Sequence, residues 1–500
     1  AASARQALLA RAAERFKVPA SDLAVDNGIV RVAREPARTV SYGELITAEG
    51  FQLKVDPKVA LKPANQYKVI GKPIPRVDIP DKVTGAATYA HDFRLPGMVH
   101  ARVIRPDELG ANLLSIDDSE SRKVSGFLQT VRKGNFLAVV ASTEWGAVKA
   151  ARAMRTNWGF GTGLPDQATV FDEWRKRPIA KEEATQKAGD AAAALTSASK
   201  RVKASYTFAV QTHASIGPSC AVADFTDGKL TVWTPSQATH SLQDELAGIT
   251  GVPRAAIRCL YLDGSGCYGR NGHEDATADA ALISTLIGKP VRVQWMRADE
   301  TARAPKSPPR AMDLEAGLDA NGNIVAWTGT FHIAFNHIVA FKPLDFPLLA
   351  ATDIGQPKPG NWVGFLFQNA GHNYDVPNIA VTTRHIAEAF FRSSHLRSPG
   401  RIENSFMDNV RGQLQKDLGI PPSSVVINAS HCHSVVRRDA DVLAVQAVKA
   451  AWGNLTPVRA GVCLGGGFSV ARYAAKASSC SSDNVSATEF ITGFVRSPDL

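Results

Sequence analysis

The chain has 500 residues, a net charge of +10 and 21% charged side chains, an ordinary globular composition that predicts about three domains. No run approaches the roughly 18 apolar residues of a membrane span, and the basic residues are dispersed, so neither a transmembrane segment nor nucleic-acid binding is expected. The six cysteines form no CxxC, CxxCH or four-cysteine cluster, which argues against a zinc ribbon, haem c or an iron–sulfur cluster on this chain.

The first 160 residues predict mixed helix and strand. A helix is expected over Arg5–Phe16, followed by a hairpin with the turn Asp26-Asn27-Gly28, and four prolines make residues 51–75 an extended connector. Between residues 76 and 160 the expected elements are two strands and a helix, at Val99–Ile104, Phe136–Ala141 and Glu144–Met154. The sequence opens at Ala1 without Met or a signal peptide, as a processed chain or a fragment would.

Strands dominate the pattern of residues 201–407, after a polar, alanine-rich stretch over 161–200 that predicts a surface connection. A hairpin turn is expected at Asp319–Asn323 before a strand at Ile324–Trp327. The other expected elements are a strand at Lys229–Trp233, a helix at Ser241–Thr250, a strand at Ala256–Leu262, a helix at Gly272–Ile287 and a strand at Val291–Met296.

The segment most suited to binding a ligand is the glycine-rich run Asp263–Asp275, which follows a strand and opens a helix. Its glycines permit positive φ and close approach of a ligand to the backbone. Amides of the loop and of the first helical turn would face outward, where the helix dipole favours an anion. A phosphate-bearing or pterin-like cofactor fits this pattern, and a tight strand-to-helix turn without a ligand fits it as well.

Two nucleotide-binding motifs fit the run poorly. A P-loop requires Gly-Lys-Ser/Thr, but Gly269 is followed by Arg270-Asn271. A dinucleotide-binding βαβ motif belongs in an early βαβ unit, whereas this loop lies in mid-chain among strands that look antiparallel.

Several longer stretches, together covering about residues 1–407, resemble the molybdopterin-binding subunit of the xanthine dehydrogenase and aldehyde oxidase superfamily, in its isoquinoline- and nicotinate-oxidoreductase-like branch. The matching stretches are Arg76–Gly85, Leu95–Ala101, Gln211–Ala221, Gly264–Gly272, Pro290–Arg297 and His395–Arg401. The resemblance implies a multi-domain α+β fold. It divides the chain into an N-terminal segment (1–66), an α/β hammerhead domain (67–165), a first molybdopterin-binding domain (166–407) and an atypical C-terminal segment (408–500).

The same resemblance implies site residues. Ser236-Gln237 matches a Thr/Ser-Gln pair whose glutamine hydrogen-bonds an oxo ligand of molybdenum, and Arg397 and Gly400 match a loop near the metal and the pterin. Gln237 and Arg397 would be catalytic, and no side chain would ligate the metal, so Cys267 would be a buried structural thiol. Without the family, Gln237 could be a turn side chain and Arg397 part of a surface salt bridge. The implied cofactor-binding residues are Ser236, Gln237, Gly264, Gly266, Cys267, Tyr268, Gly269, Arg270, Gly272, Arg397 and Gly400.

The reaction implied is hydroxylation of an N-heterocycle, with oxygen from water, or oxidation of an aldehyde, at a molybdenum–molybdopterin cytosine dinucleotide cofactor. Electrons would pass to a small partner subunit with two [2Fe–2S] clusters, with a cytochrome c subunit as a further candidate partner. Export to the bacterial periplasm, or its side of the inner membrane, is typical of this branch, and the cytoplasm is the alternative.

One expected element is missing, because the family's glutamate base lies in a Gly-Val-Gly-Glu-like motif that this sequence lacks. From about Met407 the sequence is expected to depart from the family. His431 and His433 there faintly resemble the zinc-binding pair of neutral-ceramidase-type hydrolases, but a polar strand end explains two such histidines equally well. Residues 408–500 could be degenerate or fused, their sequence could be in error, or the glutamate could lie on another chain.

Three functions therefore stay open. The first is a molybdenum hydroxylase large subunit, the second a non-catalytic scaffold of the same fold, and the third a zinc-dependent hydrolase formed by the C-terminal segment. The metal bound by the purified protein separates them.

Overall fold

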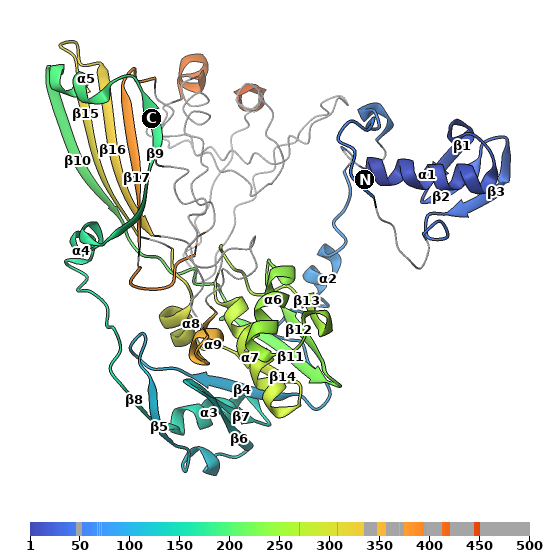
Figure 1. Ribbon diagram of the computed structural model, residues 1–500, viewed down its shortest axis with the longest axis horizontal. Helices are drawn as coiled ribbons and strands as arrows, with labels where there is room; N and C mark the ends of the chain where they lie inside the picture. Colours follow the sequence, from blue (N-terminus) through green and yellow to red (C-terminus); the bar gives the residue numbers. More distant parts are fainter. Residues whose placement is uncertain are drawn as a thin grey trace, which may run out of the picture. The chain divides into compact units, whose positions relative to one another are not determined.

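The computed structural model of the chain describes residues 1–46, 53–67, 69, 71, 73–269, 271–307, 309–334, 348–356, 370, 375–387, 389–394, 396, 413–420 and 445–450. These residues fall into two compact units, Ala1–Ile79 and the part that begins at Pro80 (Figure 1). None of the helices in the described ranges is long and apolar enough to cross a membrane. The expected His431 and His433 pair lies outside the described residues.

The first unit is a helix packed on a small antiparallel sheet. Helix α1 (Ala2–Phe16) covers strands β1 (Leu23–Asp26), β2 (Ile29–Val32) and β3 (Glu35–Ser41), and buried Leu8, Ala12, Val30, Val40 and Leu45 form its core. The turn between β1 and β2 has Asn27 at φ 47° and Gly28 at φ 77°. Positive φ at both positions is what a tight hairpin requires, so the predicted helix and hairpin are confirmed.

The second unit contains a seven-stranded mixed sheet in the order β13-β12-β11-β14-β4-β7-β6. Its strands are β4 (Val99–Ile104), β6 (Phe127–Lys133), β7 (Phe136–Ala141), β11 (Cys220–Thr226), β12 (Lys229–Thr234), β13 (Ile257–Tyr261) and β14 (Val291–Gln294). Strand β14 pairs in parallel with β4, so one continuous sheet holds strands from both the 67–165 and the 166–407 regions. Strands β5 (Leu113–Asp117) and β8 (Arg155–Trp158) pair separately.

Several helices accompany this sheet. Helix α7 packs on β11, β12 and β14 (Figure 1). The helices from Ile79 to Ala153 are α2 (Ile79–Thr84) and α3 (Glu144–Ala153), and the later ones are α6 (Thr239–Thr250), α7 (His273–Ile287), α8 (Arg297–Arg303) and α9 (Leu349–Asp353). Helix α6 ends at Gly251 with φ 77°, as the sequence predicts for a glycine that terminates a helix.

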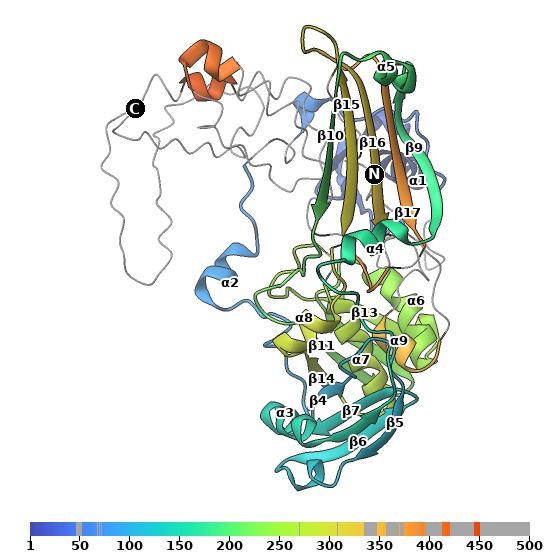
Figure 2. The same ribbon diagram turned by 90° about the vertical axis from the view of Figure 1, so that its left-hand side faces the viewer.

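A second, five-stranded sheet has the order β10-β15-β16-β17-β9, with α5 at one end (Figure 2). Its elements are α4 (Val170–Lys176), β9 (Ile179–Ala188), α5 (Ala191–Ser197), β10 (Lys200–Phe208), β15 (Arg310–Leu318), β16 (Ile324–Ala334) and β17 (Ile379–Ile386). The predicted surface connection over 161–200 is therefore wrong. Strand β9 is an exposed edge strand whose charged residues look like a loop in the sequence.

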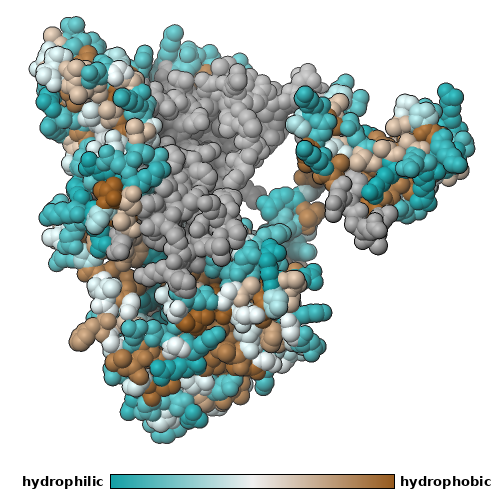
Figure 3. Space-filling model, in the orientation of Figure 1, coloured by the Kyte–Doolittle hydropathy of each residue, from teal (hydrophilic) through white to brown (hydrophobic). Residues whose placement is uncertain are grey.

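The exposed surface of the second unit mixes hydrophilic and hydrophobic residues (Figure 3). Apolar side chains on it include Leu114 of β5, Leu128 of β6 and Trp145 of α3. Individual exposed apolar residues are common on folded proteins, so we assign these no role.

Helix α7 is the centre of the second unit, because all its residues from His273 to Ser284 are buried. Two of them are aspartates one helical turn apart. Arg105, just after β4, donates hydrogen bonds of 3.1 Å and 2.6 Å to the two carboxylate oxygens of Asp279, and its Nε donates to Asp353 of α9 at 3.0 Å. Asp275 accepts the backbone amide of Leu349, the first residue of α9, at 2.8 Å. Helix α9 is thus held at its start by Asp275 of α7 and at its end by Arg105, which also binds Asp279 of α7.

Removing Arg105 should be costly, because Asp279 would remain buried without its charge partner. We expect Arg105→Ala to lower the free energy of unfolding by about 3–5 kcal/mol. Arg122→Ala is the matched control, since Arg122 also binds an aspartate, Asp118, but its side chain is 65% exposed against 10% for Arg105. The control should cost about 0–1 kcal/mol. Calorimetric midpoints that fall equally in both variants would contradict this assignment.

Candidate functional site

The glycine-rich segment between β13 and α7 meets three other segments that are distant in sequence. Segments near residues 211, 307 and 393 run beside one another, and the last of them reaches the glycine loop. The contacts are isolated β-bridges, which join Gln211 to Ser307, Lys306 to Ser393 and Gly269 to Leu396. Three of the six stretches that carry the family resemblance, Gln211–Ala221, Gly264–Gly272 and His395–Arg401, each contribute one residue to these bridges.

The backbone of the glycine loop is unusual. Gly266, Tyr268 and Gly269 have φ values of 103°, 51° and 130°. Left-handed conformations at non-glycine residues such as Tyr268 are uncommon and often occur at functional sites. The amide nitrogens of Gly264, Ser265 and Gly266 have no hydrogen-bond acceptor among the described residues. Residues 264–266 are only partly buried, so these three consecutive amides, here called the amide arc, are potential donors for an anionic or hydrogen-bond-accepting ligand.

Two other glycines serve close packing inside the protein. A Cβ at Gly264 would lie 2.8 Å from the Pro235 ring, and one at Gly272 would lie 2.6 Å from the Trp295 ring. Neither position has positive φ. Gly264 and Gly272 are therefore explained by their protein neighbours, whereas Gly266 and Gly269 are explained by backbone conformation.

The first turn of α7 is buried, whereas the sequence-based expectation was that its amides would face outward. His273, Glu274 and Asp275 are all buried, and acidic side chains occupy the start of the helix. The carboxylates of Glu274 and Asp275 already match the positive end of the helix dipole. Among the described residues of the loop and of this helical turn, the amides before Gly269 are therefore the candidates for binding an anion.

Gln237 is placed at the loop. Its side-chain Nε2 donates to the Gly269 carbonyl oxygen at 3.0 Å and to the Cys267 sulfur at 2.7 Å. The glutamine that the family resemblance places near the metal therefore contacts the glycine loop. Cys267 itself is half-buried, which differs from the fully buried thiol expected.

Ser236 has a different environment from Gln237. It is 2% exposed, and its hydroxyl donates to Glu274 at 2.9 Å and accepts the Ala238 amide at 3.0 Å. The hydroxyl therefore links the start of α6 to the first turn of α7, and its hydrogen bonds are used within the protein. Arg270, Arg397 and Gly400, the other expected site residues, lie outside the described residues.

A cluster of buried polar side chains contacts the glycine loop and the neighbouring turn. Asn271 Nδ2 donates to the Ser215 hydroxyl at 3.1 Å, and His273 Nε2 lies 3.0 Å from the Gly266 carbonyl oxygen. Burial lowers the pKa of His273, which favours its neutral form. Asn271 and His273 lie within the run singled out in the sequence, but nothing in their spacing distinguished them as supports of the loop.

The turn at residues 214–217 is fixed against the same loop. Ala214 has φ 46°, Arg297 donates to the carbonyl oxygens of Ser215 and Ile216 at 2.6 Å and 2.7 Å, and Ser265 Oγ donates to the Gly217 carbonyl at 2.8 Å. These bonds hold the exposed side of the glycine loop in one conformation.

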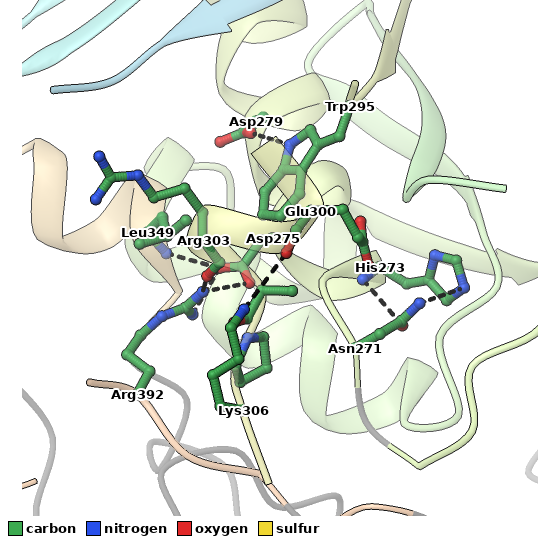
Figure 4. Close-up of polar contacts among 12 residues, drawn as sticks. Asn271, His273, Asp275, Asp279, Trp295, Glu300, Arg303, Lys306, Leu349 and Arg392 are labelled. Atoms are coloured by element: carbon green, nitrogen blue, oxygen red, sulfur yellow. Dashed lines mark hydrogen bonds and ion pairs between the residues drawn. The ribbon is translucent and has the colours of Figure 1, made fainter. Parts of the chain in front are cut away.

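A group of charged residues lies at the other end of this site. Figure 4 shows Arg392, Leu349 and Lys306 gathered around Asp275. Lys306 Nζ donates to the Ala304 carbonyl oxygen at 2.6 Å. Burial, and then the nearby Arg392 guanidinium, lower the pKa of Lys306 to about 8. Among the described residues, no three His, Cys, Asp or Glu side chains form a group able to hold a metal ion.

Comparison with known proteins gives the site a context. The model of the molybdopterin cofactor-binding domain family matches residues 171–345. A component of the nicotinate dehydrogenase of Pseudomonas putida is 33% identical over 492 residues, which cover 95% of this chain and 40% of the relative. The beta chain of isoquinoline 1-oxidoreductase from Brevundimonas diminuta is 29% identical over 469 residues, 83% of this chain and 58% of the relative. The chain therefore spans less than two thirds of these relatives.

The solved structure of aldehyde oxidoreductase from Desulfovibrio gigas shares the fold, with a TM-score of 0.53 and 19% identity over 70% of this chain and 42% of that one. The match to the Pseudomonas protein also bears on the C-terminal segment. Because 95% of this chain lies within that match, the similarity continues past residue 407, where the sequence was expected to depart from the family.

The low pKa of Lys306 predicts a pH dependence of stability. The unfolded lysine, with its ordinary pKa of 10.5, binds more protons than the folded one between about pH 8 and 10.5, so this residue makes the fold more stable as the pH rises through that range. Relative to Lys306→Met, the wild type should gain up to about 3 kcal/mol across the range. A difference in thermal midpoint that is the same at pH 8 and pH 10 would contradict the lowered pKa.

Proposed function

We propose that the chain is a molybdopterin-binding subunit of the xanthine dehydrogenase and aldehyde oxidase superfamily, and that it is the cofactor-binding part of a molybdenum hydroxylase. Its reaction would be the hydroxylation of an N-heterocycle with oxygen from water, or the oxidation of an aldehyde. The named activities of the nicotinate, isoquinoline and aldehyde relatives support these substrate classes. The amide arc of the glycine loop, beside Gln237, is the observation on which the proposal rests.

The described residues fit a pterin cofactor that carries oxygen acceptors and phosphates. The amides of Gly264, Ser265 and Gly266 are free of other described partners, and they lie where the loop is part-exposed. The Gln237 amide reaches the same loop, and its Nε2 would give up the hydrogen bond to Cys267 Sγ in order to donate to an oxo ligand. Arg270, Arg397 and Gly400 would complete the site, and the cytosine dinucleotide form of the cofactor is part of the proposal.

When bound, molybdenum would supply the redox and oxygen-transfer chemistry, and this chain would supply position and electrostatics. The loop amides would bind and orient the cofactor. The side-chain amide of Gln237 would donate a hydrogen bond in a site partly shielded from water, where such a bond is stronger than in solution. The turn at residues 214–217, held by Arg297, would keep the loop from relaxing when the cofactor leaves.

The remaining parts of the proposed enzyme would come from elsewhere. Electrons would pass to a small subunit with two [2Fe–2S] clusters, and a cytochrome c subunit is a further candidate. The general-base glutamate would lie outside the present sequence, which lacks the Gly-Val-Gly-Glu motif. We place the assembled enzyme in the bacterial periplasm, with the cytoplasm as the alternative.

Metal and nucleotide analysis tests the proposal directly. Protein purified from cells grown with molybdate should contain molybdenum and release a cytosine nucleotide on acid hydrolysis. A preparation with neither metal nor nucleotide would favour the second candidate, a non-catalytic scaffold. Stoichiometric zinc would favour a hydrolase.

Gln237→Ala should lower turnover of the assembled enzyme by about 100-fold, because one positioned hydrogen-bond donor is lost. Its molybdenum content should stay close to that of the wild type. Gln243→Ala is the control, since Gln243 of α6 also donates to a backbone carbonyl, that of Ile257, at 2.8 Å but does not contact the loop. Steady-state assays with nicotinate and with an aromatic aldehyde would measure the effect. Unchanged turnover in Gln237→Ala would remove this residue from the site.

Gly269→Val should block cofactor loading, because a β-branched side chain strains the backbone at φ 130° and so changes the conformation of the loop. Gly322→Val is the control. It imposes similar strain at φ 85° in an exposed turn where a Cβ has open space. Elemental analysis should find molybdenum in the control and little in Gly269→Val. A fully loaded Gly269→Val protein would show that the cofactor lies elsewhere.

A further inference from the structure

Two parts of the site are tied to the start of helix α7 by one ion pair. Asp275, the third residue of the helix, is 0% exposed. Arg392 Nη1 donates to Asp275 Oδ1 at 2.9 Å, and Arg392 Nη2 donates to Oδ2 at 2.8 Å (Figure 4). This two-pronged geometry fixes the orientation of both side chains as well as their distance.

The segment that begins at Arg392 continues to the glycine loop. The Lys306 amide donates to the Arg392 carbonyl at 3.0 Å, and the Ser394 amide donates to the Lys306 carbonyl at 2.8 Å. Leu396 then forms its bridge with Gly269. Arg392 thus contacts the start of α7, and Leu396, four residues further along the chain, contacts the loop.

The ion pair and the bridge together connect the glycine loop to the start of α7 at two points. Arg392 and Leu396 are four residues apart in the chain. Arg392 binds Asp275 in the helix, and Leu396 contacts Gly269 in the loop just before it. The ion pair and the bridge therefore restrain the loop and the start of α7 at the same time. Arg392 also donates to the Arg303 carbonyl at 2.7 Å, which fixes the guanidinium from a third direction.

We propose that Arg392 and Asp275 are positioning residues that set the conformation of the glycine loop at Gly266–Gly269, and through it the retention of the cofactor. The part concerning the cofactor rests on the proposed function, whereas the part concerning the loop does not. Neither residue lies in the exposed amide arc. Their effect is exerted through the segment from Arg392 to Leu396.

The chain offers a matched control in the same helix. Arg105 binds Asp279 with the same two-pronged geometry, one turn along α7 from Asp275, and it is also buried. Arg105 follows β4, and within the described part of the chain it has no hydrogen bond to the glycine loop. Replacing either arginine should lower the stability of the helix. Only replacing Arg392 should change the glycine loop.

The test compares Arg392→Lys with Arg105→Lys in the assembled complex by hydrogen–deuterium exchange. Lysine keeps the positive charge but cannot donate two parallel hydrogen bonds to one carboxylate, so both variants should have lower thermal midpoints. We expect peptides covering residues 262–270 to exchange at least fivefold faster in Arg392→Lys, and at the wild-type rate in Arg105→Lys. Pterin released on dialysis, measured by fluorescence per folded protein, should rise only in Arg392→Lys.

The outcomes separate the two claims. Equal exchange in the loop of both variants would overturn the positioning role. Faster exchange confined to Arg392→Lys, in a wild type that carries no pterin, would uphold the positioning role and overturn the proposed function. If Arg392→Lys does not fold, Asp275→Asn is the second variant, because it removes the charge while keeping one acceptor, and the same two readouts apply to it.

Discussion

The larger unit depends on buried carboxylates of helix α7. Burial raises the pKa of Asp279, and the adjacent Arg105 guanidinium offsets part of that rise. An ionised carboxylate in the interior is tolerated only when it is paired and hydrogen-bonded, so Asp279 and Asp275 oblige Arg105 and Arg392 to stay where they are. Because these arginines come from segments far apart in the chain, the helix organises the sheet on one side and the glycine loop on the other.

The site combines rigid support with a small exposed surface. Asn271, His273 and Ser215 lie buried beneath the loop, and Arg297 holds the neighbouring turn. The amides of the arc lie above them. Such an arrangement suits a cofactor that performs the chemistry itself, because the protein then needs to hold donors in place more than it needs to supply reactive side chains.

Much of the fold could be predicted from local patterns. The hairpin at Asp26–Gly28, the buried strand at Phe136–Ala141 and the helix that follows Gly272 all have strong local signals, and the structure contains each of them. Strand β9 could not be predicted, since an edge strand with both faces partly exposed carries no hydrophobic alternation. The ion pair of Arg392 with Asp275 could not be predicted either, because the two residues are distant in sequence and no local pattern links them.

The parallel pairing of β14 with β4 has a practical consequence for dissecting this protein. Domain boundaries drawn on sequence similarity near residue 165 cut through a single hydrogen-bonded sheet. A fragment that ends there would expose the backbone of β4, and the complementary fragment would expose β14. Unpaired strand edges recruit other chains, so halves expressed separately should aggregate or find each other, and a workable truncation would have to retain both strands.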